Sequence, residues 1–141
     1  MPRIFVSYRR QDSQLMAGRI QENLKQEFGN DNVFFDRYNI PSGMDFRDYL
    51  TKAVNECDYL LVIIGPGWLD VREEDGIRRL DNPNDFVRIE VQTALEADKL
   101  VIPVLVQDAK IPKESELPDT IKSLAFRNLA LVRPDPDYPN D

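Results

Sequence analysis

The chain has 141 residues, the length of one globular domain, and 42% of them are hydrophobic, which is enough for a single core. It carries 25 acidic and 18 basic residues, a formal net charge of −7. Proteins that bind nucleic acid normally present a basic surface, so this balance argues against a nucleic-acid partner. The longest apolar run, Tyr59 to Ile64, is far below the roughly 20 residues of a membrane helix. No signal-peptide pattern opens the chain. We therefore expect a cytoplasmic protein with no membrane partner.

Two scarce residue types narrow the possible chemistry further. The sequence has no histidine, which excludes Ser-His-Asp and Cys-His catalysis and histidine-ligated zinc. It has one cysteine, Cys57, so neither an internal disulfide nor a thiolate metal cluster is expected. Cys57 continues the apolar stripe of a predicted helix, and we interpret it as a buried core residue. Catalysis would have to use carboxylates, hydroxyls, Arg, Lys or backbone dipoles.

The first half of the chain alternates predicted strands with predicted helices. A strand over residues 3–8 precedes a helix capped by Asp12 or Ser13, in which Met16, Ile20, Leu24 and Phe28 recur every four residues. Residues 29–32 end this helix, and residues 33–35 form a second strand. After a loop over 36–44, a helix begins near Asp45, with one apolar face made of Phe46, Leu50, Ala53, Val54 and Cys57. Residues 59–64 form a strand that is continuously apolar, as a central parallel strand should be.

The second half continues the same alternation. A charged connection over residues 65–83, with Trp68 near its start, leads to a helix over 84–98 capped by Asn84 or Asp85. A strand follows over 100–106, interrupted by Pro103, then a loop over 107–117, a short helix over 118–126 and a strand over 128–132. We expect residues 1–132 to form the domain and residues 133–141, rich in proline and aspartate, to be a disordered tail or a linker.

Strands and helices that alternate at this spacing predict a parallel sheet with helices on both faces. The expected fold is flavodoxin-like α/β: a three-layer α/β/α arrangement with five parallel strands in the order 2-1-3-4-5. Ligands of such sheets bind beyond the carboxyl ends of the strands, at the switch point beside the first strand. Strand 1 ends in Ser7-Tyr-Arg-Arg10 and strand 3 in Gly65-Pro-Gly67, which fits neither the acidic site of a response-regulator receiver nor a flavodoxin phosphate loop.

Two residue pairs at this edge have both a binding and a structural interpretation. Arg9 and Arg10 precede a helix, where guanidinium groups and the helix dipole suit a pyrophosphate or a carboxylate. They could instead form salt bridges with loop acids such as Asp12 or Asp36. Trp68 and Phe86 could stack on a purine or nicotinamide ring, or could simply cover the core.

Glu90 lies on the predicted third helix, near the buried side. At about 100° per residue, the apolar stripe contains Val87, Val91, Ala94 and Leu95, and the solvent face contains Arg88, Gln92 and Glu96. Glu90 falls roughly opposite Gln92, on the flank shared with Phe86 and Ala97. A carboxylate turned away from water is costly unless it is paired or meets a cationic ligand. A salt bridge with Arg9 or Arg10 and a role toward a ligand both remain open.

Several ordered motifs resemble the TIR (Toll/interleukin-1 receptor) domain family, over residues 3 to about 132. They are Phe5-Val-Ser-Tyr-Arg-Arg10, Val33-Phe-Phe-Asp36, Ile40-Pro-Ser-Gly43, Cys57-Asp-Tyr-Leu-Leu-Val-Ile-Ile-Gly-Pro66 and Val101-Ile-Pro-Val104. The run Asp85-Phe-Val-Arg-Ile-Glu90 resembles the segment that carries the catalytic glutamate in the NAD+-cleaving branch, of which the bacterial-type members are the most similar. Many of those enzymes have Trp four residues before the glutamate, where this chain has Phe86.

The resemblance implies an NAD+ glycohydrolase of immune or antiviral defence signalling that yields ADP-ribose or a cyclic isomer, with NAD+ as substrate and no cofactor or metal. It makes Glu90 catalytic. It also implies an NAD+ site lined by Tyr8, Arg9, Arg10, Phe46, Trp68 and Phe86. The loop bearing Asp36, Ile40, Pro41 and Gly43 would mediate self-association with other TIR domains, although an exposed loop could equally be a lid.

Two alternatives of other classes remain. The domain could be a non-catalytic adaptor that uses the same loop to recruit other TIR domains. It could also bind a nucleotide signal without hydrolysing it. Cleavage is plausible for a protein without histidine, because nicotinamide leaves NAD+ as a neutral molecule and needs no general acid. A fixed carboxylate can lower the remaining barrier by stabilising the positive charge that grows on the ribose.

Overall fold

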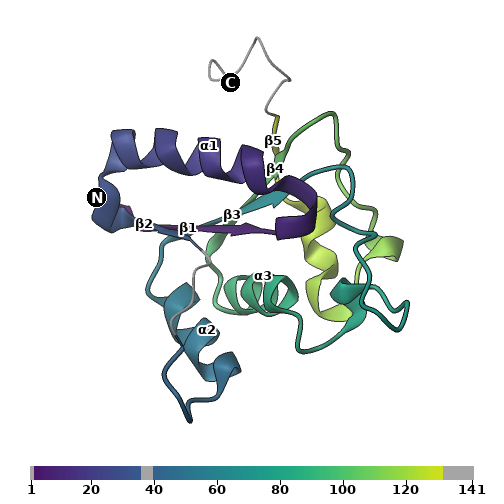
Figure 1. Ribbon diagram of the computed structural model, residues 1–141. Helices are drawn as coiled ribbons and strands as arrows, with labels where there is room; N and C mark the ends of the chain where they lie inside the picture. The colour runs from purple at the N-terminus through teal and green to yellow at the C-terminus, as the bar shows by residue number, and fades with distance from the viewer. Residues whose placement is uncertain (1, 36–39, 132–141) are drawn as a thin grey trace.

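A computed structural model describes residues 2–35 and 40–131 of the chain. Strands and helices alternate along it (Figure 1). The strands are β1 (Ile4–Tyr8), β2 (Val33–Phe35), β3 (Tyr59–Ile64), β4 (Leu100–Leu105) and β5 (Ala130–Leu131). The α-helices are α1 (Arg10–Phe28), α2 (Phe46–Asn55) and α3 (Phe86–Glu96), and the 3-10 helices are η1 (Asn30–Asn32), η2 (Arg79–Asp81), η3 (Glu114–Glu116) and η4 (Asp119–Phe126). The predicted tail over 133–141 lies outside the described residues.

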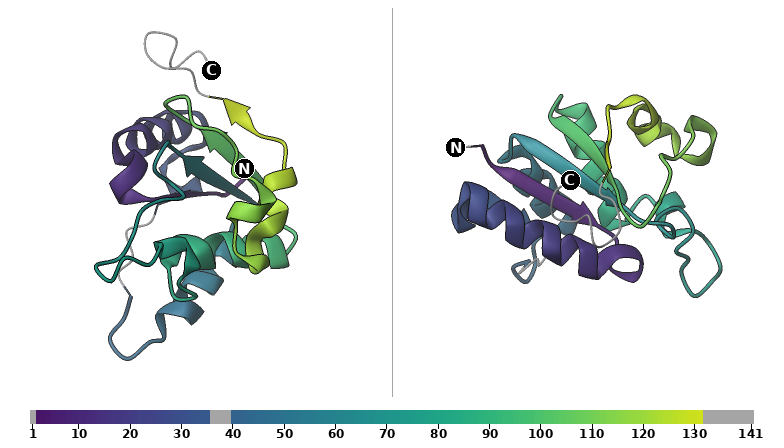
Figure 2. Two further views of the ribbon diagram at one scale, coloured as in Figure 1. Left: turned by 90° about the vertical axis from the view of Figure 1, so that its right-hand side faces the viewer. Right: turned by 90° about the horizontal axis from the view of Figure 1, so that it is seen from above.

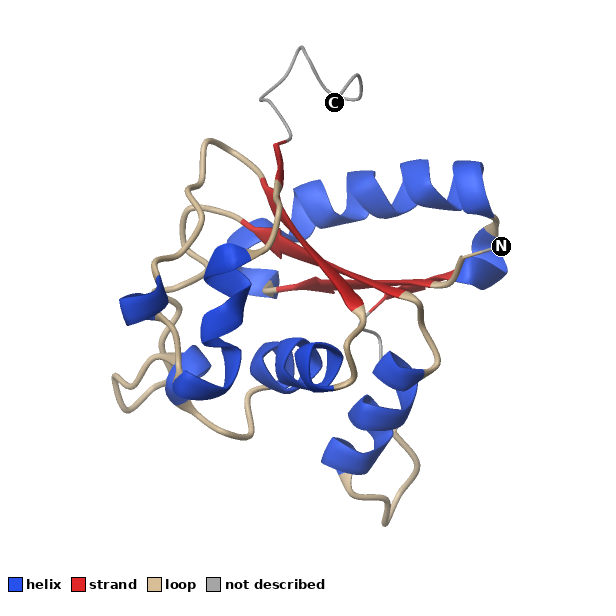
Figure 3. Cartoon of the chain, turned by 180° about the vertical axis from the view of Figure 1, so that it is seen from behind, coloured by secondary structure: helices blue, strands red, loops and turns tan. Residues whose placement is uncertain are grey.

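The five strands form one parallel sheet in the order β2-β1-β3-β4-β5, which confirms the predicted topology. β1 pairs with β2 from Ile4 opposite Val33, and with β3 from Ile4 opposite Tyr59. α1 covers one face of this sheet, while α2, α3 and η4 lie on the other (Figures 1 and 3). The architecture is the three-layer, flavodoxin-like α/β/α arrangement that the alternation of elements predicts.

The side chains of β1 and β3 divide between two hydrophobic clusters, one on each face of the sheet. Phe5 belongs to the cluster beneath α3, whereas Ile4 and Val6 belong to the cluster beneath α1. Along β3, Leu60, Val62 and Ile64 likewise face α3 and Ile63 faces α1. This is the period-two alternation of a strand, here with apolar residues on both sides. It explains why β3 is apolar throughout.

The start of α1 differs from the prediction. The helix begins at Arg10, and its N-cap, Arg9, makes no side-chain capping hydrogen bond. Ser13 has non-helical backbone angles (φ −144°, ψ 29°), so a single turn precedes the main helix. The carboxylate of Asp12 instead accepts hydrogen bonds from the backbone N–H groups of Gly65 and Gly67. The prediction that Asp12 or Ser13 caps α1 was therefore wrong, because Asp12 binds a loop far away in sequence and the hydroxyl of Ser13 accepts no hydrogen bond from the helix.

The C-terminal third is less regular than predicted. β5 contains Ala130 and Leu131, whereas the prediction began it at residue 128. η4 follows Pro118 as expected but is a 3-10 helix with a kink at Ile121. Pro103 lies inside β4 opposite Val62, and β5 pairs with β4 only after this proline. Proline has no N–H to donate, which agrees with the late start of that pairing.

Cys57 is 2% exposed and lies in the core cluster beneath α3, which confirms its predicted burial. Burial raises the pKa of its thiol to about 11, so the sulfur stays protonated at neutral pH. Across the described residues, no helix is both long and apolar enough to cross a membrane. The same residues contain no cluster of three or more Cys, Asp or Glu side chains that could hold a metal ion.

Candidate functional site

The carboxyl ends of β1 and β3 meet beside the amino end of α3. The chain leaves β1 for α1 on one face of the sheet, and leaves β3 for the connection that leads to α3 on the other face (Figure 2). This divergence is the topological switch point of the sheet, where open α/β folds bind their ligands. Of the seven residues predicted to catalyse the reaction or bind NAD+, six belong to or adjoin these segments, and the seventh, Phe46, begins α2.

Arg9 is held at this edge by an ion pair with Asp85. Its Nη1 and Nη2 atoms donate to Oδ1 and Oδ2 of Asp85 at 2.9 and 2.7 Å, and the two side chains are 4% and 7% exposed. The structural interpretation of Arg9 named loop acids such as Asp12 or Asp36 as its partner, whereas the observed partner is Asp85. Asp36 lies outside the described residues. Arg10, the next residue, is exposed.

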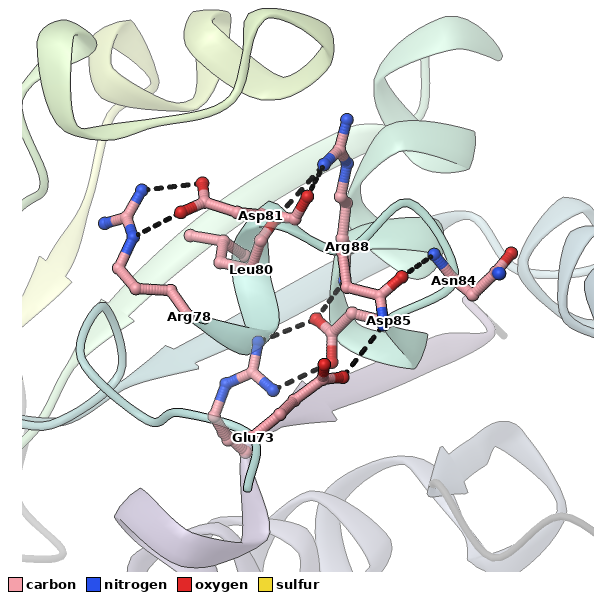
Figure 4. A network of polar contacts seen from close by, with 9 residues as sticks. Glu73, Arg78, Leu80, Asp81, Asn84, Asp85 and Arg88 are labelled. Atoms are coloured by element: carbon pink, nitrogen blue, oxygen red, sulfur yellow. Dashed lines mark hydrogen bonds and ion pairs between the residues drawn. The ribbon is translucent and has the colours of Figure 1, made fainter. Parts of the chain in front are cut away.

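Asp85 also caps α3. Its Oδ2 accepts a hydrogen bond from the backbone N–H of Arg88 at 3.1 Å, which confirms Asp85 as one of the two predicted caps. Figure 4 shows Asp85 within a wider polar network that includes Glu73, Asp81 and Arg88. Arg88 donates to the backbone oxygens of Leu80 and Asp81 at 3.3 and 3.1 Å. The amino end of α3 is therefore tied to β1 and to η2 by charged side chains.

Asp12 ties the loop after β3 to the start of α1. Its two carboxylate oxygens accept from Gly65 and Gly67 at 2.8 and 2.7 Å. A Cβ atom on Gly65 would lie 2.6 Å from Oδ1 of Asp12, so this close approach requires glycine. The geometry fixes both loops of the switch point relative to each other.

Glu90 is buried on the sheet side of α3. It is 1% exposed and lies beside the core residues Val87, Val91 and Ala94 on the helix. The predicted position on the flank of the apolar stripe is confirmed. Arg9, one of its predicted alternative partners, is bound to Asp85. A carboxylate buried in this way is a candidate functional residue, because its surroundings control its charge.

The four predicted aromatic residues divide into buried and accessible pairs. Tyr8 is 2% exposed and Trp68 is 1% exposed, and their rings lie in the two core clusters. Phe46 is half-buried and Phe86 is 41% exposed, with ring centroids 5.2 Å apart and planes at 32°. Phe86 precedes Glu90 by four residues, one helical turn, so the two side chains are neighbours on α3. Of these four rings, Phe46 and Phe86 are the ones that a ligand can reach.

The described part of the predicted self-association loop is a tight turn. The N–H of Met44 donates to the carbonyl of Pro41 at 3.1 Å, and Gly43 has φ +85°. Glycine at this position is what a type II turn requires. Pro41 and Gly43 are exposed and Ile40 is half-buried, so the turn projects a small apolar surface ahead of α2.

A cavity lies elsewhere in the described structure, between α2 and α3. Its volume is about 570 Å³, and most of its lining residues are polar, including Arg47, Asn55, Arg88, Gln92 and Glu96. Sequence reasoning placed Arg88, Gln92 and Glu96 on the solvent face of α3 and did not foresee a groove there. Neither Glu90 nor Phe86 lines it. We favour the switch point as the site, because the buried carboxylate and the accessible aromatic rings lie there.

Comparisons with known proteins agree with this fold. The family model described as "TIR domain" matches residues 4–136. The chain is 28% identical over 126 residues to the NAD(+) hydrolase tir-1 of Caenorhabditis elegans, and 25% identical over 128 residues to the NAD(+) hydrolase sarm1 of Drosophila melanogaster. Each match covers 89% of this chain, but the chain spans 12% and 9% of those two proteins.

A solved structure shows the same fold. It is that of the activated Roq1 resistosome directly recognizing the pathogen effector XopQ, matched through its TIR domains with a TM-score of 0.56 and 14% identity. The match covers 89% of this chain and 69% of the other.

Proposed function

This chain belongs to the TIR domain family, and we propose that it cleaves NAD+ between nicotinamide and ribose, with Glu90 as the catalytic residue. The observation that carries the proposal is the carboxylate of Glu90, buried on α3 at the switch point of the sheet. The similarity to two proteins named NAD(+) hydrolases supports it. The role would be in immune or defence signalling.

The proposed reaction breaks the bond between C1′ of the ribose and the ring nitrogen of nicotinamide. The bonding electron pair goes to that nitrogen, so nicotinamide leaves neutral and no residue has to protonate it. Positive charge grows on the ribose, and the Glu90 carboxylate stabilises it electrostatically while accepting hydrogen bonds from ribose hydroxyls. Water then adds to C1′ and releases a proton to the solvent, giving ADP-ribose. Attack by a nucleophile within the same molecule gives a cyclic isomer instead.

The residues around Glu90 suggest how the substrate would lie. Phe46 and Phe86 form a partly exposed aromatic surface, with Phe86 one helical turn from Glu90, on which the nicotinamide or adenine ring can stack. Arg10 is exposed at the amino end of α1 and would meet the phosphates. Tyr8 and Trp68 would support the site from within the core rather than contact the substrate, because both rings are buried.

Access to Glu90 requires a change in its surroundings, because the side chain is 1% exposed. We propose that self-association provides this change: the turn at Pro41 and Gly43 of one copy would complete the site of a neighbouring copy. Activity should then rise more steeply than in proportion to protein concentration. An adaptor without catalytic activity would use the same exposed turn, so the comparison across concentration also separates these two functions.

The test is release of nicotinamide from NAD+, measured by chromatography across protein concentration. Glu90→Gln keeps the size of the side chain and removes its charge, and should lower the rate about 100-fold or more. Glu96→Gln is the matched control on the same helix, because Glu96 is exposed and bonded to Gln92, and it should leave the rate unchanged.

Cleavage that survives Glu90→Gln would refute the assignment of Glu90. If the unmodified protein releases no nicotinamide at any concentration, the adaptor function is favoured. Tight calorimetric binding of an intact nucleotide without cleavage would instead favour a nucleotide-sensing domain.

A further inference from the structure

We infer that Arg9 and Asp85 are a positioning pair that holds the amino end of α3, and with it Glu90, against the carboxyl end of β1. Arg9 then acts on the reaction through Asp85 and not by contact with the phosphates of NAD+. This inference rests on the proposed catalytic role of Glu90. It reassigns one of the two arginines that the sequence places at the switch point.

The ion pair has the geometry of a rigid connection. Two parallel hydrogen bonds of 2.9 and 2.7 Å join the guanidinium of Arg9 to both carboxylate oxygens of Asp85. The two residues are 76 positions apart in sequence, and their side chains are 4% and 7% exposed. A planar, two-bond contact between buried groups fixes orientation as well as distance.

Asp85 transmits this constraint to α3 because the same oxygen serves two bonds. Its Oδ2 accepts from Nη2 of Arg9 and from the backbone N–H of Arg88. The cap of the helix therefore cannot shift without disturbing the ion pair. Glu90 follows the cap by five residues, about 7.5 Å along the helix axis at a rise of 1.5 Å per residue. A displacement at the cap thus moves the carboxylate that has to face the ribose.

The environment of Arg9 leaves it poorly suited to binding phosphate. Both of its terminal nitrogens are engaged by Asp85, and the residue as a whole is 3% exposed. The other N–H groups of its guanidinium, including that on Nε, are buried with it, so a phosphate could reach Arg9 only if the residues around the ion pair moved aside. Arg10 is exposed beside it and has no such obstacle.

The chain supplies a matched control on the neighbouring helix. Asp45 caps α2 in the same way, and its carboxylate also binds an arginine, Arg47. This second pair is exposed, with side-chain exposures of 60% for Arg47 and 41% for Asp45. We therefore compare Asp85→Asn with Asp45→Asn, and Arg9→Lys with Arg47→Lys. Asparagine caps a helix about as well as aspartate, so the Asp→Asn changes remove the charge and keep the cap.

The kinetic constants for NAD+ cleavage are measured for each variant, at a temperature below the lowest unfolding transition of the set. For a positioning pair, Asp85→Asn and Arg9→Lys should each lower kcat about tenfold or more and leave KM within about twofold. The double variant should be no worse than either single variant, because the two residues act as one unit. The variants at Asp45 and Arg47 should match the unmodified protein.

A direct contact between Arg9 and phosphate gives a different pattern. Arg9→Lys would then raise KM, while Asp85→Asn, which frees Arg9, would lower it or leave it unchanged. That result would overturn the inference. Unchanged kinetic constants in both variants would also overturn it, because the pair would then contribute to folding alone.

Hydrogen exchange tests the same inference without relying on catalysis. Peptides covering the first two turns of α3 should exchange about tenfold faster in Asp85→Asn and Arg9→Lys than in the control variants. If the unmodified protein does not cleave NAD+, the proposed function fails, and unchanged exchange in α3 would separately refute the positioning role. If Asp85→Asn does not fold, Arg9→Lys decides the question by the same two measurements.

Discussion

Two helices of this domain begin with the same pair of residue types, used in opposite ways. Asp45 caps α2 and binds Arg47, two positions further along the chain, with both side chains exposed to solvent. Asp85 caps α3 and binds Arg9, 76 positions away, with both side chains buried. The local chemistry is alike, and the difference lies in what each arginine is attached to.

The comparison shows which charged pairs depend on the assembled fold and which do not. A pair two residues apart can form in an isolated segment, and solvent weakens it to the point where it contributes little. A pair that joins β1 to α3 forms only when the sheet and the helix are assembled. Breaking it leaves a buried charge without its partner. Asp12 follows the second pattern, since it binds backbone N–H groups 53 and 55 positions away.

The largest loss of stability should come from removing the buried capping aspartate, Asp85. Asp85→Ala removes the cap and leaves Arg9 buried without its partner. It should lower the free energy of unfolding by about 4 kcal/mol. For a domain of this size, the melting temperature would fall on the order of 10 °C. Asp45→Ala removes the exposed cap and should have a much smaller effect. Thermal unfolding followed by circular dichroism compares the two, and equal losses would show that burial of the Arg9 pair does not matter.

A smaller effect is expected where Asp12 meets the loop after β3. Gly65→Ala would place a methyl group 2.6 Å from the Asp12 carboxylate, and the resulting strain should cost about 2 kcal/mol. Gly18→Ala is the control, because a Cβ there meets nothing within 4 Å, and it should stabilise α1 slightly. Chemical denaturation measures both. If Gly65→Ala costs as much in an Asp12→Ala background, the contact with Asp12 is not the cause.

The smallest effect concerns the exposed pair itself. A side-chain hydrogen bond from Arg47 lowers the pKa of Asp45 below its ordinary value of 3.8. A lowered pKa stabilises the folded state above that ordinary value, and the contribution is lost as the pH falls through the folded pKa. Arg47→Gln should return the pKa of Asp45 toward 3.8, as measured by NMR titration of its carboxyl carbon. High salt should shrink the shift in the unmodified protein, and a shift insensitive to salt would mean that the pair is not solvent-screened.

Much of the fold follows from local patterns. The pattern of apolar residues predicts the bounds of β1, β3, α2 and α3 within one or two residues. It does so because residues that face the core recur at the period of the strand or helix. The position of Glu90 near the buried side of α3 follows from the same geometry. The short, irregular elements could not be predicted as accurately from the sequence. β5 is two residues long and η3 lies in a predicted loop, since short segments carry too few residues to show a period.

What the tertiary structure alone decided is the partner of those charged and aromatic residues whose contacts are distant in sequence, such as Arg9, Asp12 and Trp68. Nothing local to Arg9 distinguishes Asp12, Asp36 and Asp85 as its acid, and nothing local to Trp68 distinguishes a core ring from one that stacks on a ligand. Those outcomes depend on which distant segments the sheet brings together at the carboxyl ends of β1 and β3. Sequence determines the period of burial along each element, because that is a property of neighbouring residues. Only the assembled sheet determines the contacts, because they join residues more than fifty positions apart.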